Sequence, residues 1–171
     1  RELGWLGFGA VSKELLAHPA PDVDDLQATL KRLRISADAI VITGHTVHSD
    51  DAMRRLAHES WNLDDIDRRY AKFVDRFDPV RRSAGRKASF PAKTAFLVRT
   101  LLIQEYRKVL LRDPKLPREM LPDRWHGNAA YRLCRDLYRL TYQAADDYLS
   151  TTIETRDGAL HTPGHDSRVS F

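Results

Sequence analysis

Arginine side chains recur at helical spacing in two segments of the second half of the chain. Arg99 and Arg107 belong to one segment, and Arg132, Arg135 and Arg139 belong to the other. A guanidinium group offers a planar fork of donors that can hold a phosphate or a carboxylate through two hydrogen bonds. The pattern therefore predicts a site for an anionic ligand. Its candidate cations are Arg99, Arg107, Arg112 and Arg135.

Two tryptophans and a histidine beside loops extend this candidate site. Trp61 and Trp125 lie near predicted helix starts, where an indole ring can form a wall for an acyl or adenine group. His126 directly follows Trp125 and is placed to act as a base if the ligand is hydrolysed. These three residues complete the predicted ligand site.

A structural role for the same residues stays open. Glu105, Asp113 and Asp136 lie close in sequence to the arginines, and ion pairs among these groups would join the helices and the loop between them. A tryptophan is also a common anchor of a hydrophobic core. The sequence alone leaves both interpretations standing.

Metal-binding and thiol patterns are weak in this sequence. The lone Cys134 allows no internal disulfide and is predicted to pack inside a helical bundle. The pairs His45/His48 and His161/His165 are not accompanied by the further ligands that a zinc site requires. We therefore expect no metal and no nucleophilic cysteine.

Two glycines near the start of the chain are expected to serve the fold. Gly7 and Gly9 lack the third glycine and the following helix of a dinucleotide fingerprint. They predict a strand that another group approaches closely. With no catalytic residues and no cofactor site recognisable, we expect a protein that is not an enzyme.

The composition is that of a folded chain with a thin excess of positive charge. Of 171 residues, 28 are Lys or Arg and 24 are Asp or Glu, so the formal net charge is +4. This balance supports weak affinity for polyanions at most. The sequence contains no apolar run near the roughly 20 residues of a transmembrane helix and no signal peptide, so a cytoplasmic protein is expected. Because no initiator Met is present, the chain is expected to be the interior of a longer protein.

The first 48 residues predict part of an α+β domain. Two apolar runs, at 6–11 and 15–18, flank a polar centre and predict a hairpin. Asp22 precedes an apolar stripe at helical spacing and predicts a capped helix. The β-branched run Ala39–Thr43 predicts a buried strand. The leading strand and helix of such a domain are expected upstream of the chain.

Residues 49–158 predict a helical domain. Ser49 is expected to cap a short helix, and Asn62 a longer one that ends at Pro79. The basic stretch at 81–87 has no apolar residue larger than alanine and predicts a loop.

Two further helices are predicted in the same domain. The first spans about 89–111 and is apolar on nearly every face, so it is expected in the middle of a bundle. A loop with three prolines follows, and a last long helix spans about 128–153. Residues 159–171 predict a flexible tail.

The arginine-rich region also carries an ordered series of motifs. It runs through Arg99–Lys108, Leu111–Pro114, Leu116-Pro117, Leu121-Pro122, Trp125, Gly127 and Arg135–Tyr138, with flanking matches at Leu3–Gly9 and Ser60–Leu63. This series resembles the phenylacetate-degradation repressors, the PaaX-type transcriptional regulators. The resemblance extends from about Leu3 to Leu149, and its long middle part makes it specific.

The resemblance implies a bacterial repressor with an N-terminal winged helix that reads DNA, a central ferredoxin-like domain and a C-terminal helical domain. It also implies a homodimer that releases its operator when phenylacetyl-CoA or a related CoA thioester binds. The expected fold class is α+β, a partial ferredoxin-like unit followed by a mainly α-helical bundle. Operator DNA is expected to bind through an N-terminal domain that this chain lacks.

The combined expectation is the effector-sensing and dimerisation portion of such a repressor, which regulates transcription in phenylacetic acid catabolism. Two alternatives remain. An acyl-CoA thioester hydrolase would release a free thiol, with His126 as the base. A ligand-free structural dimerisation module would show a well-packed bundle with every named arginine in an ion pair and no cavity.

Overall fold

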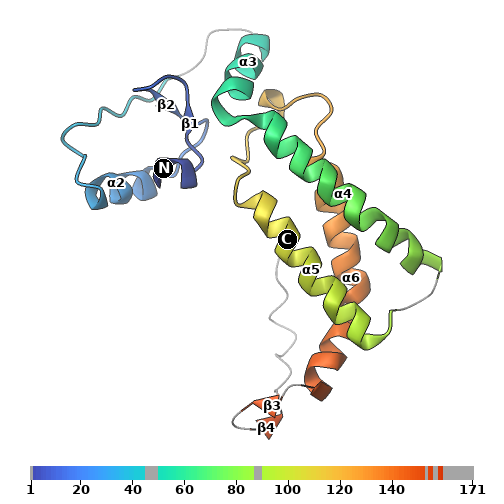
Figure 1. The fold of residues 1–171 in the computed structure, drawn as a ribbon. Helices are drawn as coiled ribbons and strands as arrows, with labels where there is room; N and C mark the ends of the chain where they lie inside the picture. Colours follow the sequence, from blue (N-terminus) through green and yellow to red (C-terminus); the bar gives the residue numbers. More distant parts are fainter. Residues whose placement is uncertain (1, 45–49, 87–89, 153, 156–157, 160–171) are drawn as a thin grey trace. The chain divides into compact units, whose positions relative to one another are not determined.

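Figure 1 shows a computed structural model of the chain, which describes residues 2–44, 50–86, 90–152, 154–155 and 158–159. These residues are mostly helical and include two antiparallel pairs of short strands. The chain divides into unit 1, with residues 1–68 and 109–125, and unit 2, with residues 69–108 and 126–171. The predicted histidine pairs, the Ser49 cap and nearly all of the predicted tail fall outside the described residues.

Unit 1 combines a small hairpin with short helices. Its elements are α1 (Glu2–Trp5), β1 (Gly9–Ala10), β2 (Leu16–Ala17), α2 (Val23–Arg32), α3 (Asp50–Trp61) and the 3₁₀ turn η1 (Arg118–Met120). The predicted hairpin is confirmed, because β1 and β2 pair antiparallel with Gly9 opposite Ala17. Ser12 closes its turn, since the Ser12 hydroxyl accepts the N–H of Leu15 at 3.2 Å.

The predicted capped helix is confirmed as α2. The Asp22 carboxylate accepts two backbone N–H groups of the first turn, both at 3.0 Å. Leu26 and Leu30 of the predicted stripe are buried. At the other end, Arg32 donates to the carboxylate of Glu2 in α1 at 2.6 Å. The cap and the apolar stripe together explain why this segment is helical.

The predicted strand at Ala39–Thr43 is wrong for this structure. These residues form no regular element, and the side chains of Ile40 and Ile42 are 88% and 84% exposed. A strand requires hydrogen bonds to a neighbouring strand, and neither described sheet offers one to this segment. The described residues therefore do not complete a ferredoxin-like sheet.

His18 links the hairpin to the start of the α2 segment through its neutral imidazole. The ring lies 5.1 Å from the ring of Phe8, and its Nδ1 accepts the N–H of Ala20 at 3.0 Å. Partial burial lowers the pKa of His18, because desolvation disfavours the charged imidazolium. The folded chain thus holds His18 in its neutral form more strongly than the unfolded chain does.

We expect unit 1 to lose stability on acidification. The unfolded chain binds a proton at His18 more readily, so the contribution of His18 is complete above about pH 6.5 and is lost as the pH falls through the lower folded pKa. The measurement is the urea midpoint from about pH 7.5 to about pH 5.5. His18→Asn keeps an acceptor for Ala20 but does not titrate, so its midpoint should depend less on pH. Equal pH dependence of the two proteins would refute this role.

Unit 2 is a helical bundle, which confirms the predicted helical region. Its elements are most of α4 (Leu63–Arg86), most of α5 (Ala92–Leu110), α6 (Gly127–Thr152) and the strands β3 (Glu154–Thr155) and β4 (Gly158–Ala159). The ring of Tyr106 on α5 lies 6.4 Å from Tyr70 and 5.4 Å from Phe73 on α4. Nearer the start of α5, Phe96 lies 5.4 Å from Tyr148 of α6. Aromatic contacts therefore join the three helices that run side by side in Figure 1.

Helix α4 extends further than predicted. Pro79 does not end it, and the segment predicted as a basic loop is helical up to Arg86. The carboxylate of Asp78 pairs with Arg81 at 2.7 Å and with Arg82 at 3.1 Å, and Ala84 is buried. Ion pairs at these spacings and the packing of the last turns offset the single backbone hydrogen bond that proline removes.

Helix α5 does not occupy the middle of the bundle as predicted. Its Ala95, Leu102 and Tyr106 are buried, but Leu97 and Leu101 are 50% and 53% exposed. A helix that is apolar all round usually has neighbours all round. The outer face of α5 is thus an apolar surface that the described part of this chain does not cover.

Candidate functional site

The side chain of Arg99 is held between two tyrosines of α6. Its guanidinium carbon lies 4.7 Å from the ring centre of Tyr138 and 4.8 Å from that of Tyr142. Its Nη2 donates to the Tyr138 hydroxyl at 3.0 Å. The other terminal nitrogen, Nη1, is buried and has no hydrogen-bond partner among the described residues. A buried donor without a partner costs about 1–3 kcal/mol, and folded proteins normally satisfy it with water or a ligand.

Arg135 and Arg107 add two cations to unit 2. Arg135 lies on α6 with its guanidinium 6.0 Å from the ring centre of Tyr131, and it pairs with the adjacent Asp136 at 3.3 Å. Arg107 is exposed two turns after Arg99 on α5, and within the described part of the chain it has no ion pair. Guanidinium groups of both helices therefore occur together with phenol rings of α6.

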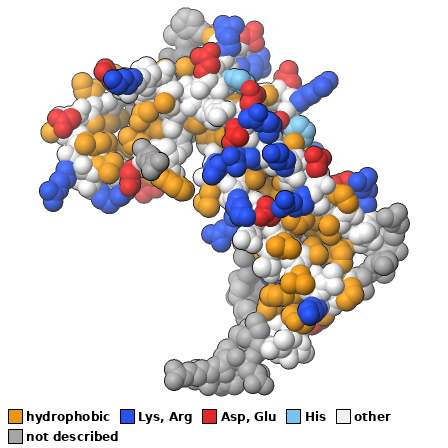
Figure 2. Space-filling model, in the orientation of Figure 1, with side chains coloured by type: hydrophobic (Ala, Val, Ile, Leu, Met, Phe, Trp, Pro, Cys, Tyr) orange, Lys and Arg blue, Asp and Glu red, His pale blue; other side chains and the backbone are white. Residues whose placement is uncertain are grey.

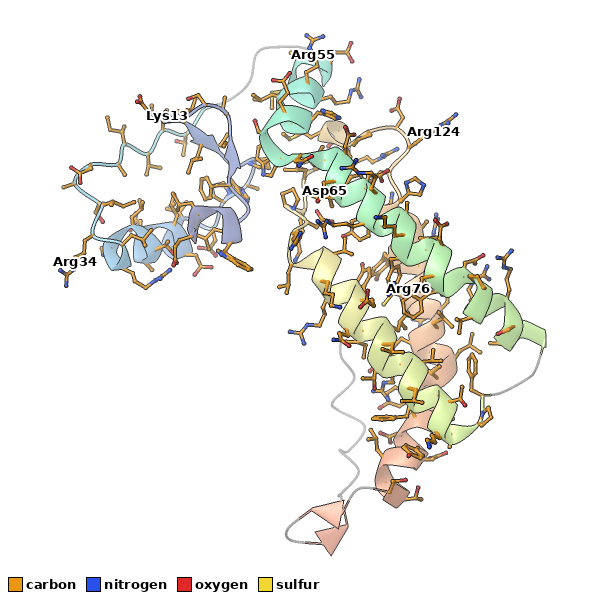
Figure 3. All side chains as sticks on the ribbon, viewed as in Figure 1. Lys13, Arg34, Arg55, Asp65, Arg76 and Arg124 are labelled. Carbon is orange, nitrogen blue, oxygen red and sulfur yellow. The ribbon has the colours of Figure 1, made fainter. Side chains whose placement is uncertain are left out.

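Only part of the predicted ion pairing takes place. Glu105 pairs with Lys108 at 2.6 Å and with Arg76 of α4, which is labelled in Figure 3, at 3.1 Å. The hydrogen bond from Lys108, together with the charges of Lys108 and Arg76, holds the pKa of Glu105 below its ordinary value. Glu105 is therefore engaged with other cations and leaves Arg99 and Arg107 without a carboxylate partner.

Trp61 serves as an anchor of unit 1. Its Nε1 donates to the carbonyl of Gly7 at 2.7 Å, although 54 residues separate the two. Gly9 lies directly against the indole, so that a Cβ at this position would be 2.4 Å from the ring. Gly7 has a φ of +86°, a conformation that favours glycine. The predicted close approach at these glycines is confirmed, and Trp61 is the group that makes it.

The other candidates lie on loops and helix ends. Arg112 is exposed in unit 1, and its backbone N–H donates to the carbonyl of Val109 at 2.9 Å. Trp125 is half-buried in unit 1. His126 is exposed in unit 2, where its carbonyl accepts the N–H of Ala130 and opens α6. The seven candidates are thus divided between the units, with Trp61, Arg112 and Trp125 in unit 1 and Arg99, Arg107, His126 and Arg135 in unit 2.

Unit 1 also contains an apolar hollow of about 450 Å³. Leu3, Phe8, Leu16, Leu33 and Ile35 line most of it. Figure 2 shows hydrophobic side chains gathered over this body of the protein. The volume falls in the range of small-molecule sites, but the lining offers few polar groups that could orient a ligand.

Two other classes of site receive no support from the described residues. Burial raises the pKa of the Cys134 thiol to about 11, so it remains protonated and acts as a packing group. No group of three or more potential metal ligands occurs within the ranges that the structure describes.

In the same ranges, no helix is both long enough and apolar enough to cross a membrane.

The tyrosines around the arginines were missed by reasoning from sequence. Tyr131, Tyr138 and Tyr142 follow one another along α6 at spacings of seven and four residues, which places them on one flank of the helix. That spacing is the feature of the sequence that could have indicated a row of tyrosines on α6. Its meaning depends on which α5 side chain faces this flank, and the sequence does not give the register of the two helices.

Comparison with known proteins connects this region to a family. Residues 61–151, just over half of the chain, match the PaaX-like protein C-terminal domain. The chain belongs to the PaaX-like family. It is also 33% identical over 167 residues to the Transcriptional repressor PaaX of Escherichia coli (strain K12). That match covers 96% of this chain and 53% of the relative, so the chain spans about half the length of the curated relative.

The PaaX-like C-terminal domain contains every predicted site residue. Trp61 stands at its first matched position, and the remaining six candidates lie between it and Thr151. The tyrosines of α6 that contact Arg99 and Arg135 also fall within the match. The arginine and tyrosine cluster is therefore part of the PaaX-like domain.

Proposed function

We propose that this chain is the effector-sensing and dimerisation portion of a cytoplasmic transcriptional repressor and has no enzymatic activity. Its membership of the PaaX-like family and its similarity to a transcriptional repressor support this role. Operator DNA binds through an N-terminal winged helix outside these 171 residues, and the effector is phenylacetyl-CoA or a related CoA thioester. The regulated genes then serve phenylacetic acid catabolism.

The observation that carries the sensing role is the set of arginines without carboxylate partners. A ligand-free structural module predicts every named arginine in an ion pair, whereas Arg99 and Arg107 have none among the described residues. A CoA thioester supplies phosphates for such cations and an acyl group for an aromatic wall. The predicted contact residues are Arg99, Arg107, Arg112, Arg135, Trp61, Trp125 and His126.

Residues 1–48 are proposed as part of the central ferredoxin-like domain, and residues 49–158 as the C-terminal helical domain. Ile40, Val41 and Ile42 are β-branched and exposed, as expected for a strand whose neighbour lies elsewhere in the protein. In the longer repressor their amides should exchange slowly with deuterium. Equally fast exchange in the longer repressor and in this chain would contradict the proposal.

The proposed sensing mechanism is a linkage between effector and operator. An effector releases DNA only if it binds the DNA-incompetent state more tightly than the competent one, and the coupling is reciprocal. A shift of the interface between protomers can link effector binding to DNA binding. The two halves of an operator bind a dimer only when its two DNA-binding domains have the matching spacing. Operator DNA should accordingly weaken the binding of the thioester.

The test is operator release by the full-length repressor titrated with phenylacetyl-CoA. We expect release, and we expect Arg107→Ala and Arg135→Ala each to raise the required concentration about tenfold, which corresponds to about 1.4 kcal/mol. Arg139→Ala on the same helix is the control for loss of a positive charge. No release with any aryl-CoA thioester would contradict the proposed function, and unchanged release by both variants would remove these arginines from the site.

The outer face of α5 is proposed as the contact of the homodimer. If two copies pair antiparallel about the midpoint of Leu97 and Leu101, these leucines meet their counterparts and Lys93 faces Glu105 of the second copy. Such a self-complementary patch is what a two-fold interface requires.

We expect Leu97→Glu to make the chain monomeric at about 50 µM in sedimentation, because it places two like charges at the centre of the contact. Leu140→Glu is the matched control, since Leu140 on α6 is 46% exposed and lies outside this face. A wild-type chain that already sediments as a monomer, or a Leu97→Glu variant that remains a dimer, would reject this face.

A further inference from the structure

The surroundings of the Arg99 side chain differ from those of the arginines that form short ion pairs. Arg32, Arg54 and Arg81 each donate to a carboxylate oxygen at 2.6–2.7 Å. Arg99 has two phenol rings and one phenol hydroxyl instead. A guanidinium group is charged at every relevant pH, so its charge is balanced here by ring electrons and not by an anion. The site is therefore cationic and short of one acceptor.

The orientation of this cation is fixed before any ligand arrives. The rings of Tyr138 and Tyr142 lie 5.9 Å apart at 54°, and the Arg99 guanidinium is within cation–π distance of both. The hydrogen bond from Nη2 to the Tyr138 hydroxyl occupies one end of the fork. What remains is Nη1, a buried donor without a protein partner among the described residues. A donor held in this way loses little conformational freedom when an acceptor binds.

A second cation lies on the same flank of α6. Arg135 precedes Tyr138 by one turn, and its acidic partner among the described residues is the adjacent Asp136 at 3.3 Å, which is a loose pair. Arg107 follows Arg99 by eight residues, about 12 Å along α5. A ligand with one oxyanion at Arg99 therefore has a further cation within reach along the helices.

We infer that Arg99, clamped by Tyr138 and Tyr142, binds an oxyanion of a small-molecule ligand through Nη1, with Tyr138 as the residue that positions it. The inference rests on the proposed function and specifies which group receives the acidic part of the effector. A phosphate and a carboxylate share the required chemistry, namely an anionic oxygen that accepts from a charged N–H.

The experiment is titration calorimetry of the chain with two probes. Coenzyme A carries phosphates and no aryl acid, and phenylacetate carries a carboxylate and no phosphate. We expect one of the two probes to bind. Arg99→Lys should raise the Kd of that probe about tenfold, because the lysine ammonium lacks the planar set of N–H donors that fits between the two tyrosine rings. Binding of coenzyme A identifies a phosphate as the oxyanion, and binding of phenylacetate identifies a carboxylate.

Two further variants separate ligand binding from a structural role. Arg139→Ala removes an exposed positive charge from the neighbouring helix α6 and should change the Kd by less than about twofold. Tyr138→Phe keeps the ring but removes the hydroxyl that holds Nη2, so the Kd should rise by a smaller factor than in Arg99→Lys, and the melting temperature should fall. A purely structural Arg99 would lower the melting temperature in Arg99→Lys and leave the Kd unchanged. That result, or the absence of binding by either probe, overturns the inference.

This inference and the proposed function can fail separately. If the full-length Arg99→Lys repressor releases its operator at the wild-type concentration of thioester, the function stands and the Arg99 site is wrong. If the wild-type repressor never responds to a thioester but Arg99→Lys still weakens probe binding tenfold, the site stands and the proposed function is wrong.

Discussion

Replacing Gly9 by alanine should destabilise unit 1 by about 3 kcal/mol. The new Cβ would lie 2.4–2.5 Å from two carbon atoms of the Trp61 indole. The indole cannot simply withdraw, because its Nε1 is tied to the carbonyl of Gly7 at 2.7 Å. The hairpin or helix α3 must therefore move, and the contact that joins them is lost. The measurement is the urea midpoint followed by tryptophan fluorescence.

Gly4→Ala is the matched control for this substitution. Gly4 lies in α1, and a Cβ there would have no atom within 4 Å. Alanine also favours a helix over glycine, so the stability should stay within about 1 kcal/mol of the wild type. Equal midpoints for Gly9→Ala and Gly4→Ala would show that the indole does not hold the hairpin as described.

Leu137→Ala should cost unit 2 about 3–4 kcal/mol. Leu137 is fully buried on α6, and its removal leaves a cavity that a well-packed bundle fills only in part. We expect a large fall in the melting temperature measured by circular dichroism. Leu140→Ala, on the same helix but 46% exposed, should change stability by less than about 1 kcal/mol. Similar losses for the two variants would mean that α6 buries a different face.

The sequence signals that predicted correctly are local ones. Asp22 caps α2 through its own neighbours in the chain. Ala130, Leu133 and Leu137 recur at helical spacing and are buried on α6, although Leu140 of the same series is 46% exposed. Gly7 and Gly9 correctly predicted that another group lies close to the backbone, although only the structure shows that this group is Trp61. The cap and the buried helix positions depend on residues within a few turns of one another, whereas the partner of the glycines lies far along the chain.

The predictions that failed depend on distant or compensating contacts. The β-branched run at Ala39–Thr43 has strand propensity, but propensity is insufficient where no strand lies beside it. A proline normally ends a helix, but α4 continues beyond Pro79 because the ion pairs of Asp78 and the burial of Ala84 stabilise its last turns. The apolar pattern of α5 correctly predicted a helix but wrongly predicted that this helix lies in the middle of the bundle.

The candidate site was predictable only in part for the same reason. Arginine chemistry drew attention to Arg99, but its two tyrosine neighbours are 39 and 43 residues away on another helix. Interhelical register decides which side chains meet, and it follows from the packing of the whole bundle. A sequence can therefore indicate the cation and the class of ligand chemistry without indicating what orients the cation.

The proposed sensing role requires that this chain bind the effector without the rest of the repressor. Titration calorimetry of the 171-residue chain with phenylacetyl-CoA, in the absence of DNA, tests it directly. The account predicts one site per chain and a Kd within about threefold of that of the full-length repressor. Binding by the full-length repressor with no detectable binding by this chain would contradict it.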